Sequence, residues 1–242
     1  MKNKLITLSI VFFFLKSFGF AKDFKFETQK IEITSDGKFI NATNGKATSS
    51  DGNLEIVGDR FIFDRDQNTL NINGDGSIKI KSQNLELFFK DALVNQNNQT
   101  IQINGDVNIF DNKNNLTIIS NSIFYNQKKN LIESKFKTKI KDKNKNEYLV
   151  DQFFYEVDKD LLKVENLSFK DNQNNNMQTS LAYINTKTNR IFGKDVSINL
   201  NNENFENGNQ PRLKGKSIIN DEKFLELNKG VFTTCKKRDG CP

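Results

Sequence analysis

The sequence contains no histidine and no tryptophan, and it has only two prolines and two cysteines in 242 residues. Without histidine, the chain lacks the side chain that most often serves as an acid or base near neutral pH and most often ligates metals. The sequence also shows no P-loop, no nucleophile elbow and no zinc-ligand spacing. We therefore expect a protein that is not an enzyme and that uses no cofactor and no metal.

The first 21 residues, MKNKLITLSIVFFFLKSFGFA, have the pattern of a secretory signal peptide. Lys2 and Lys4 precede an apolar run, and Gly19 and Ala21 supply the small residues of a cleavage site after Ala21. The apolar run is shorter than a helix that spans a bilayer. We expect residues 1–21 to be removed and the mature chain to be exported.

The charges of the mature chain are balanced. Removal of the three lysines in the signal peptide leaves 36 − 3 = 33 basic and 30 acidic residues, so the net charge falls from +6 to +3. Basic and acidic residues are interspersed along the sequence, whereas a nucleic-acid-binding protein usually concentrates its positive charge. We expect no nucleic-acid partner.

A repeat with a spacing of 31 residues runs through the mature chain. Four asparagines mark it (84 − 53 = 115 − 84 = 146 − 115 = 31), and apolar columns follow the same spacing. The clearest columns are Phe61, Ala92, Ile123 and Phe154; Phe63, Val94 and Tyr125; and Ile78, Ile109 and Ile140. Similarity at a fixed period is typical of stacked structural units.

Within each copy, apolar and polar residues alternate. The segment IQINGDVNI (101–109) places its apolar residues on one side, which is the period-two pattern of a β-strand. Polar segments such as DRDQN and NQNNQ are typical of turns, and NGDGS (73–77) indicates a strand interruption. A single hairpin cannot bury its apolar face, so we predict an all-β fold of stacked antiparallel hairpins. The hairpins would form two facing sheets around a shared apolar interior.

The residues alone leave the role of that interior open. It can be the packed core of a β-sandwich or β-solenoid, or a trough, open along one side, that holds the acyl chains of a lipid. Apolar residues on inner faces fit both descriptions.

The segment LEIVGDRFIFDRDQNTLNINGDGSIKI (54–80) resembles the OstA-type repeats of the lipopolysaccharide-transport family. This family includes LptA and the N-terminal domain of LptD. The resemblance covers roughly residues 24–232, and the tail GVFTTCKKRDGCP (230–242) resembles the segment that joins the periplasmic domain of LptD to its barrel. We therefore expect an OstA/LptA-like β-jellyroll over residues 22–232 and a cysteine-containing junction over 233–242, with the C-terminal barrel missing.

The resemblance implies a V-shaped β-jellyroll through which lipopolysaccharide passes, acyl chains inside and sugars outside, at the periplasmic face of the outer membrane. No bond is made or broken there. The apolar columns place the following residues in the lipid-binding interior: Ile72, Ile78, Ile101, Ile103, Val107, Ile109, Ile132, Phe136 and Ile140. Lys79, Lys81 and Lys90 are either contacts for lipid phosphates or ordinary solvated side chains.

The resemblance also implies partners. An LptA-like periplasmic protein would add a strand to the first strand of this chain, residues 23–34. The edge residues that would carry this contact are Phe24, Phe26, Thr28, Ile31 and Ile33. An LptE-like lipoprotein would bind through the missing barrel.

The two cysteines lie in the tail of an exported chain, where disulfides persist. We predict a local Cys235–Cys241 disulfide. The resemblance leaves another pairing open, because cysteines of LptD tie this domain to the barrel.

Three alternatives to an LptD-type domain follow from these observations. The first is a stand-alone LptA-like bridge protein, which would not need the tail with its two cysteines. The second is a secreted β-solenoid that acts as an adhesin or structural protein with a filled core. The third, an enzyme of envelope polysaccharide, is disfavoured because nothing resembles paired acid and base carboxylates.

Overall fold

The computed structural model describes residues 24–205, 209–221 and 223–235. In this part of the chain, seventeen strands form one antiparallel sheet. The first strands are β1 (Phe24–Ile33), β2 (Phe39–Ser49), β3 (Leu54–Asp64), β4 (Thr69–Ile80), β5 (Leu85–Asn95), β6 (Thr100–Asp111) and β7 (Leu116–Asn126). The others are β8 (Leu131–Ser134), β9 (Thr138–Lys141), β10 (Glu147–Val150), β11 (Gln152–Glu156), β12 (Leu161–Lys170), β13 (Asn176–Asn185), β14 (Arg190–Asn199), β15 (Arg212–Asn220), β16 (Leu225–Asn228) and β17 (Val231–Thr233).

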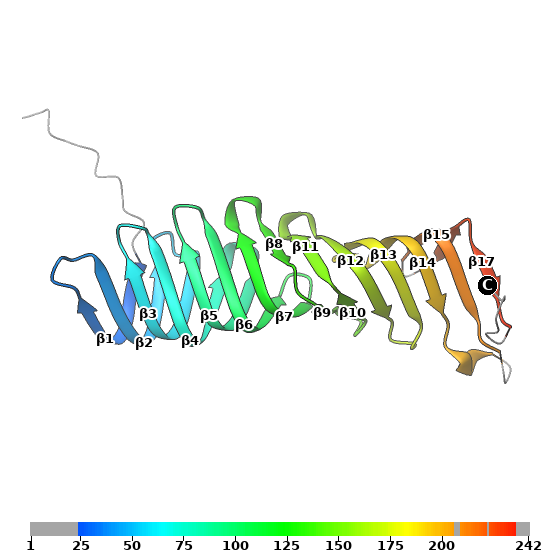
Figure 1. Ribbon diagram of the computed structural model, residues 1–242, viewed down its shortest axis with the longest axis horizontal. Helices are drawn as coiled ribbons and strands as arrows, with labels where there is room; N and C mark the ends of the chain where they lie inside the picture. Colours follow the sequence, from blue (N-terminus) through cyan, green and yellow to red (C-terminus); the bar gives the residue numbers. More distant parts are fainter. Residues whose placement is uncertain (1–23, 206–208, 222, 236–242) are drawn as a thin grey trace, which may run out of the picture.

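Strands that follow one another in sequence pair with one another, so the sheet is a long meander (Figure 1). Strands β8 and β9 are the two parts of one interrupted strand, because both pair with β7. Strands β10 and β11 are related in the same way, since both pair with β12. The molecule is an elongated stack with β1 at one end and β16 and β17 at the other (Figure 1).

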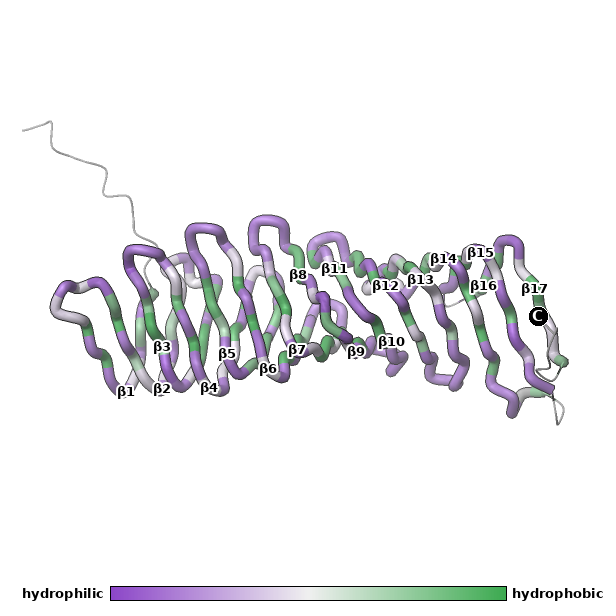
Figure 2. Tube along the Cα trace, in the orientation of Figure 1, coloured by the Kyte–Doolittle hydropathy of each residue, from purple (hydrophilic) through white to green (hydrophobic). Residues whose placement is uncertain are grey.

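Short 3₁₀ helices occupy four of the connections: η1 (Lys81–Gln83), η2 (Gln127–Lys129), η3 (Val157–Lys159) and η4 (Asn202–Asn204). Polar residues gather in the turns, while apolar and polar residues alternate along the strands (Figure 2). The described part of the chain contains no helix long and apolar enough to cross a membrane.

The strands turn a corner near their middle. In β3, the buried positions Leu54 and Ile56 are followed by two successive exposed residues, Asp59 and Arg60, and burial resumes at Phe61 in the opposite phase. Two outward residues in a row interrupt the period of two, so side chains before and after the corner face the same interior. The single sheet is thereby folded along its corners into two halves.

We call these halves half I and half II. Half I contains the strand segments 45–49, 54–58, 76–80, 85–89, 107–111 and 116–120, and half II contains 39–43, 60–64, 69–73, 91–95, 100–104 and 122–126. The fold therefore differs from the expectation of two facing sheets, because each strand contributes to both faces. At corners such as Asp59 and Arg60 the residues are ordinary polar residues, so the sequence alone gives no sign that the strand continues through them.

Contacts between aromatic rings show that the two halves face each other. Phe24, in the half-I part of β1, lies edge-on against Phe63 of half II, with the ring centroids 5.7 Å apart. Phe26 lies edge-on against Phe61 at 6.0 Å. Such pairs are favourable beyond the apolar area that they bury.

The recurring NGD motif forms β-bulges at the corners of β4 and β6. The pairing register shifts between Asn73 and Gly76 and again between Asn104 and Val107, so each of these strands carries one more residue than its neighbours. Gly74 and Gly105 have positive φ angles of 90° and 76°, a conformation that favours glycine. This agrees with the strand interruption expected at 73–77.

The interior is one continuous apolar cluster that runs through the stack. Isoleucine, leucine, valine and aromatic side chains from both halves fill it, and most of them have no exposed surface. The predicted all-β fold of stacked antiparallel strands around an apolar interior is confirmed.

Candidate lipid-binding interior

Eight of the nine residues expected to line the interior lie there. The structure places them in one cluster with an exposed fraction of 0%: Ile72, Ile78, Ile101, Ile103, Val107, Ile109, Ile132 and Ile140. Their alternation with polar neighbours on the strands accounts for this arrangement. That they bind lipid stays a prediction.

The ninth residue, Phe136, does not line the interior, contrary to the expectation. Its side chain is 51% exposed, and it lies in the break between β8 and β9. Phe136 lies two residues from the buried Ser134 and two from the buried Thr138, so strict alternation would point it inward. Lys135, Phe136 and Lys137 instead form the corner of this strand, and all three are exposed. The period-two pattern fails here because the chain turns.

The sequence columns also misplace the fourth copy of the repeat by one residue. Phe61, Ala92 and Ile123 are buried, but the buried residue that continues their column is Phe153, and Phe154 is only half-buried. Both residues are phenylalanines, so composition could not separate them.

Buried tyrosines are an important part of the interior; the apolar columns of the sequence include Tyr125, but sequence reasoning missed Tyr148 and Tyr155. Tyr125, Tyr148 and Tyr155 are among the largest fully buried side chains. Each hydroxyl reaches a polar partner at a strand end: Tyr125 donates to Asn130 Oδ1 at 3.0 Å, and Tyr148 donates to Asp142 Oδ2 at 2.8 Å. Burial raises the pKa of Tyr125 to about 12.

The turns of half I and half II meet along one side of the stack, which we call the mouth. A groove of about 220 Å³ marks it, lined on one side by half-I residues such as Ser49, Asp51 and Asn53 and on the other by half-II residues such as Gln96 and Gln99. Because the interior side chains are not exposed, the mouth is closed in this structure.

The end of the stack at β1 leaves inward-facing apolar side chains exposed. In the described part of the chain β1 pairs only with β2. Ile31 pairs with the buried Ala42, and Ile33 with the buried Ile40, yet Ile31 and Ile33 are 46% and 56% exposed. No further strand of the described chain covers them.

The other predicted edge residues of β1 lie on the same inward face. Phe24 is buried, and Phe26 and Thr28 are half-buried. The inward-facing positions are even-numbered up to Thr28 and odd-numbered from Ile31 onward, because Gln29 and Lys30 form the corner of this strand. Whether this strand binds a partner stays a prediction.

The opposite end, at β16 and β17, is similar. Through their pairing with β15, Leu225 lies in the column of the buried Ile191 and Phe232 in the column of the buried Ile198. Leu225 is nevertheless 42% exposed and Phe232 is 55% exposed. In the described part of the chain, the apolar interior therefore ends without a polar cap on both sides.

The three lysines considered for phosphate contacts are paired with carboxylates of neighbouring strands. The pairs are Lys79 with Glu86 at 3.0 Å, Lys81 with Glu55 at 2.7 Å and Lys90 with Asp106 at 2.5 Å. All three lysine side chains are about half exposed, so these are solvated surface pairs of small energetic weight. This favours the interpretation as ordinary surface residues.

The tail is only partly described. Val231–Thr233 forms β17 on β15, and Arg212 Nη1 donates a hydrogen bond of 2.7 Å to the carbonyl oxygen of Cys235. Cys241 and the signal peptide lie outside the described residues, so the disulfide and the cleavage site stay predictions. Among the described residues, no group of histidine, cysteine, aspartate or glutamate is suited to hold a metal ion.

Comparison with known proteins gives a weak structural likeness. No protein-family model and no curated protein matches the chain. Among solved structures the chain is similar to LptH of Pseudomonas aeruginosa, described as the LptA homologous periplasmic component of the conserved lipopolysaccharide transport device. The identity is 12% and the TM-score 0.42, over 47% of this chain and 84% of that chain. A likeness at this level does not establish the family, so the functional inference rests on the geometry of the chain.

Proposed function

We propose that this chain carries lipopolysaccharide through the periplasm toward the outer membrane by shielding its acyl chains in the apolar interior. The observation that carries this proposal is that the interior runs the length of the stack and ends with exposed, inward-facing apolar residues at both ends. A self-contained repeat protein covers its terminal units with polar faces. Ends that the described residues leave without a polar cap instead favour an interior that continues into a neighbouring protein.

The physical need for such an interior follows from the lipid. Burial of each CH₂ group is worth about 0.8 kcal/mol, so a molecule with several acyl chains does not cross water unshielded at a useful rate. Walls of isoleucine, leucine and valine suit a moving cargo, because hydrophobic contact has no preferred direction. The proposal assigns no bond-making step to the chain.

Within this function, we propose an LptD-type periplasmic domain at the outer membrane. The support is the tail 230–242, whose two cysteines a stand-alone LptA-like bridge would not need. An LptA-like protein would pair its edge with β1, so that the two interiors line up, and an LptE-like lipoprotein would bind through a barrel. The exposed Ile31 and Ile33 supply apolar surface for the first contact.

A structural protein or adhesin with a filled core is the second candidate. The observation in its favour is that most of the interior side chains have no exposed surface. Under this alternative the interior would never admit lipid, which separates the two candidates by experiment.

A photo-crosslinking amino acid at Ile103 tests the proposal. Ile103 is buried in the interior, and its neighbour Gln102 points outward on the same strand. With purified protein and lipopolysaccharide, we expect capture of lipid from position 103 and none from the control position 102. A third position, Ile33, tolerates a larger side chain because it is exposed. No capture from positions 103 and 33, or equal capture from position 102, would favour the filled-core alternative.

A further inference from the structure

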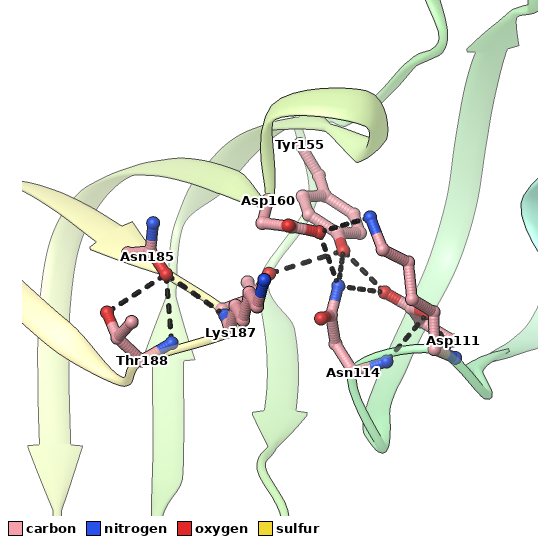
Figure 3. Close-up of polar contacts among 9 residues, drawn as sticks. Asp111, Asn114, Tyr155, Asp160, Asn185, Lys187 and Thr188 are labelled. Carbon is pink, nitrogen blue, oxygen red and sulfur yellow. Dashed lines mark hydrogen bonds and ion pairs between the residues drawn. The ribbon is translucent and has the colours of Figure 1, made fainter.

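One cluster of polar side chains connects the two halves of the sheet across the mouth (Figure 3). Asp111, Lys113 and Asn114 come from the end of β6 and the turn that follows it, on half I. Tyr155 and Asp160 come from β11 and the turn before β12. Strand β11 pairs with β8, and β8 pairs with the half-II part of β7, so both residues lie on half II. We call these five residues the latch.

The contacts of the latch are dense. Asn114 Nδ2 lies 2.9 Å from Asp111 Oδ2, 3.0 Å from the Tyr155 hydroxyl and 2.9 Å from Asp160 Oδ1. The Tyr155 hydroxyl donates to Asp111 Oδ2, and Lys113 Nζ forms an ion pair of 2.8 Å with Asp160. Asp111 is 1% exposed, so its bonds to Asn114 and Tyr155 are shielded from water and are costly to leave unmade. The ion pair of Lys113 with Asp160 is more open to solvent, because the lysine side chain is 49% exposed.

The turn does not need these bonds for its own shape. Asp111 Oδ1 already accepts hydrogen bonds from the backbone N–H groups of Lys113 and Asn114, at 2.9 and 3.1 Å. These local bonds are the ones with which aspartates commonly stabilise turns. The bonds to Tyr155 and Asp160 are additional, and they join residues more than 40 positions apart.

A second tyrosine–aspartate pair provides a contrast. The Tyr148 hydroxyl donates to Asp142 Oδ2 at 2.8 Å, across the turn between β9 and β10. Strand β9 pairs with the half-I part of β7, and β10 pairs with β9, so both residues lie within half I. Tyr148 and Tyr155 are similarly buried and have the same type of partner, but only Tyr155 connects the two halves.

At the groove lined by Gln96 and Gln99, polar contacts hold the two sides of the mouth together less firmly. There Gln96 Oε1 is buried, yet it has no hydrogen-bond partner in the described part of the chain. A side chain left in this way costs free energy instead of contributing to closure. The latch is therefore the strongest polar connection that the described residues show between the two rows of turns.

We infer that the latch controls whether the mouth opens to admit acyl chains from the side. This inference rests on the proposed function. A lipid with a large polar head must keep that head in water while its acyl chains lie in the interior, so the interior must open along one side. The mouth is the side where the sheet is not continuous, and the latch crosses it.

The first test measures opening without lipid. A cysteine at the buried position Ile118, in a background with Cys235 and Cys241 replaced by serine, reacts with a thiol reagent only when the interior is exposed. Tyr155→Phe should raise the labelling rate about fivefold, which corresponds to the loss of one ordinary hydrogen bond. Tyr148→Phe, the matched control, should leave the rate within about twofold of the parent protein. Equal rates in the two variants would overturn the inference.

The second test locks the mouth. Asn114→Cys and Asp160→Cys, joined by a disulfide or by a short bifunctional thiol reagent, should abolish lipopolysaccharide capture by a photo-crosslinker at Ile103, and reduction of the disulfide should restore it. If the locked protein captures lipid as well as the reduced protein does, lipid enters elsewhere and the latch inference is wrong. If neither the reduced nor the parent protein captures lipid while Tyr155→Phe still accelerates labelling, the proposed function is wrong and the lipid part of the inference falls with it.

Discussion

Replacement of Gly105 by alanine tests whether the corners of the strands are built as the structure shows. Gly105 lies in the bulge of β6 with a φ of 76°, and a Cβ added there would lie 2.8 Å from Cβ of Lys90 on β5. Gly52 provides a matched control, because it has a similar φ of 71° and a Cβ there would meet no atom within 4 Å.

The two substitutions share one cost and differ in another. An alanine in the left-handed region costs about 1–2 kcal/mol, partly offset by about 0.4–1 kcal/mol from the smaller entropy of the unfolded chain. We therefore expect Gly52→Ala to lower the free energy of unfolding by about 1 kcal/mol. Gly105→Ala must also move the backbone of β6 away from Lys90, because Cβ of Lys90 cannot rotate away. Overpacking of this kind costs about 1–3 kcal/mol more.

Urea denaturation measures both values. We expect a lower midpoint for Gly105→Ala than for Gly52→Ala, with an unchanged slope that shows equal surface exposed on unfolding. Equal losses of stability in the two variants would refute the close approach of β6 to β5 at the corner, and with it our account of the NGD motif.

Three further predictions follow. Ile109→Ala should lower the free energy of unfolding by about 2–5 kcal/mol, because it removes a buried side chain. Phe136→Ala, at an exposed corner, should lower it by less than about 1 kcal/mol. Similar losses for the two variants in urea denaturation would place Phe136 in the interior after all. Glu27→Pro should weaken binding of an LptA-like protein in a pull-down, because proline removes a backbone N–H of the edge strand. The circular dichroism spectrum should stay unchanged. Full binding by the folded variant would show that the partner docks at another edge. The free energy of unfolding should fall as the pH rises from about 10 to 12. Burial raises the pKa of Tyr125 to about 12, so the unfolded chain loses this proton at a lower pH than the folded chain does. Urea midpoints that do not fall between pH 9 and pH 11 would contradict the burial of Tyr125.

Much of the fold could be predicted from local pattern. Alternation in segments such as 101–109 predicts strands, and the 31-residue spacing predicts a stack, so Ile103 and Ile109 could be assigned to the interior. These features depend only on neighbours in sequence and on burial of one strand face.

The corners and the latch could not be predicted in the same way. At most corners, two polar residues in a row look like an ordinary lapse of alternation. At residues 135–137 the alternation even continues in the sequence although all three residues are exposed, which is why Phe136 was misplaced. The latch depends on how the two halves of the sheet fold together, which brings Asp111 next to Tyr155 across 44 positions of sequence. A tyrosine near a strand end is the only local sign of such a contact, and Tyr148 shows that the sign does not reveal which half the partner comes from.

The central claim is that the interior binds acyl chains, and calorimetric titration of the purified protein tests it most directly. We predict that intact lipopolysaccharide binds with a negative heat-capacity change, the mark of apolar surface leaving water, and that the same saccharide with its acyl chains removed does not bind. Binding of the deacylated saccharide with the same affinity, or no binding of intact lipopolysaccharide to protein whose mouth is unlocked by Tyr155→Phe, would contradict the account.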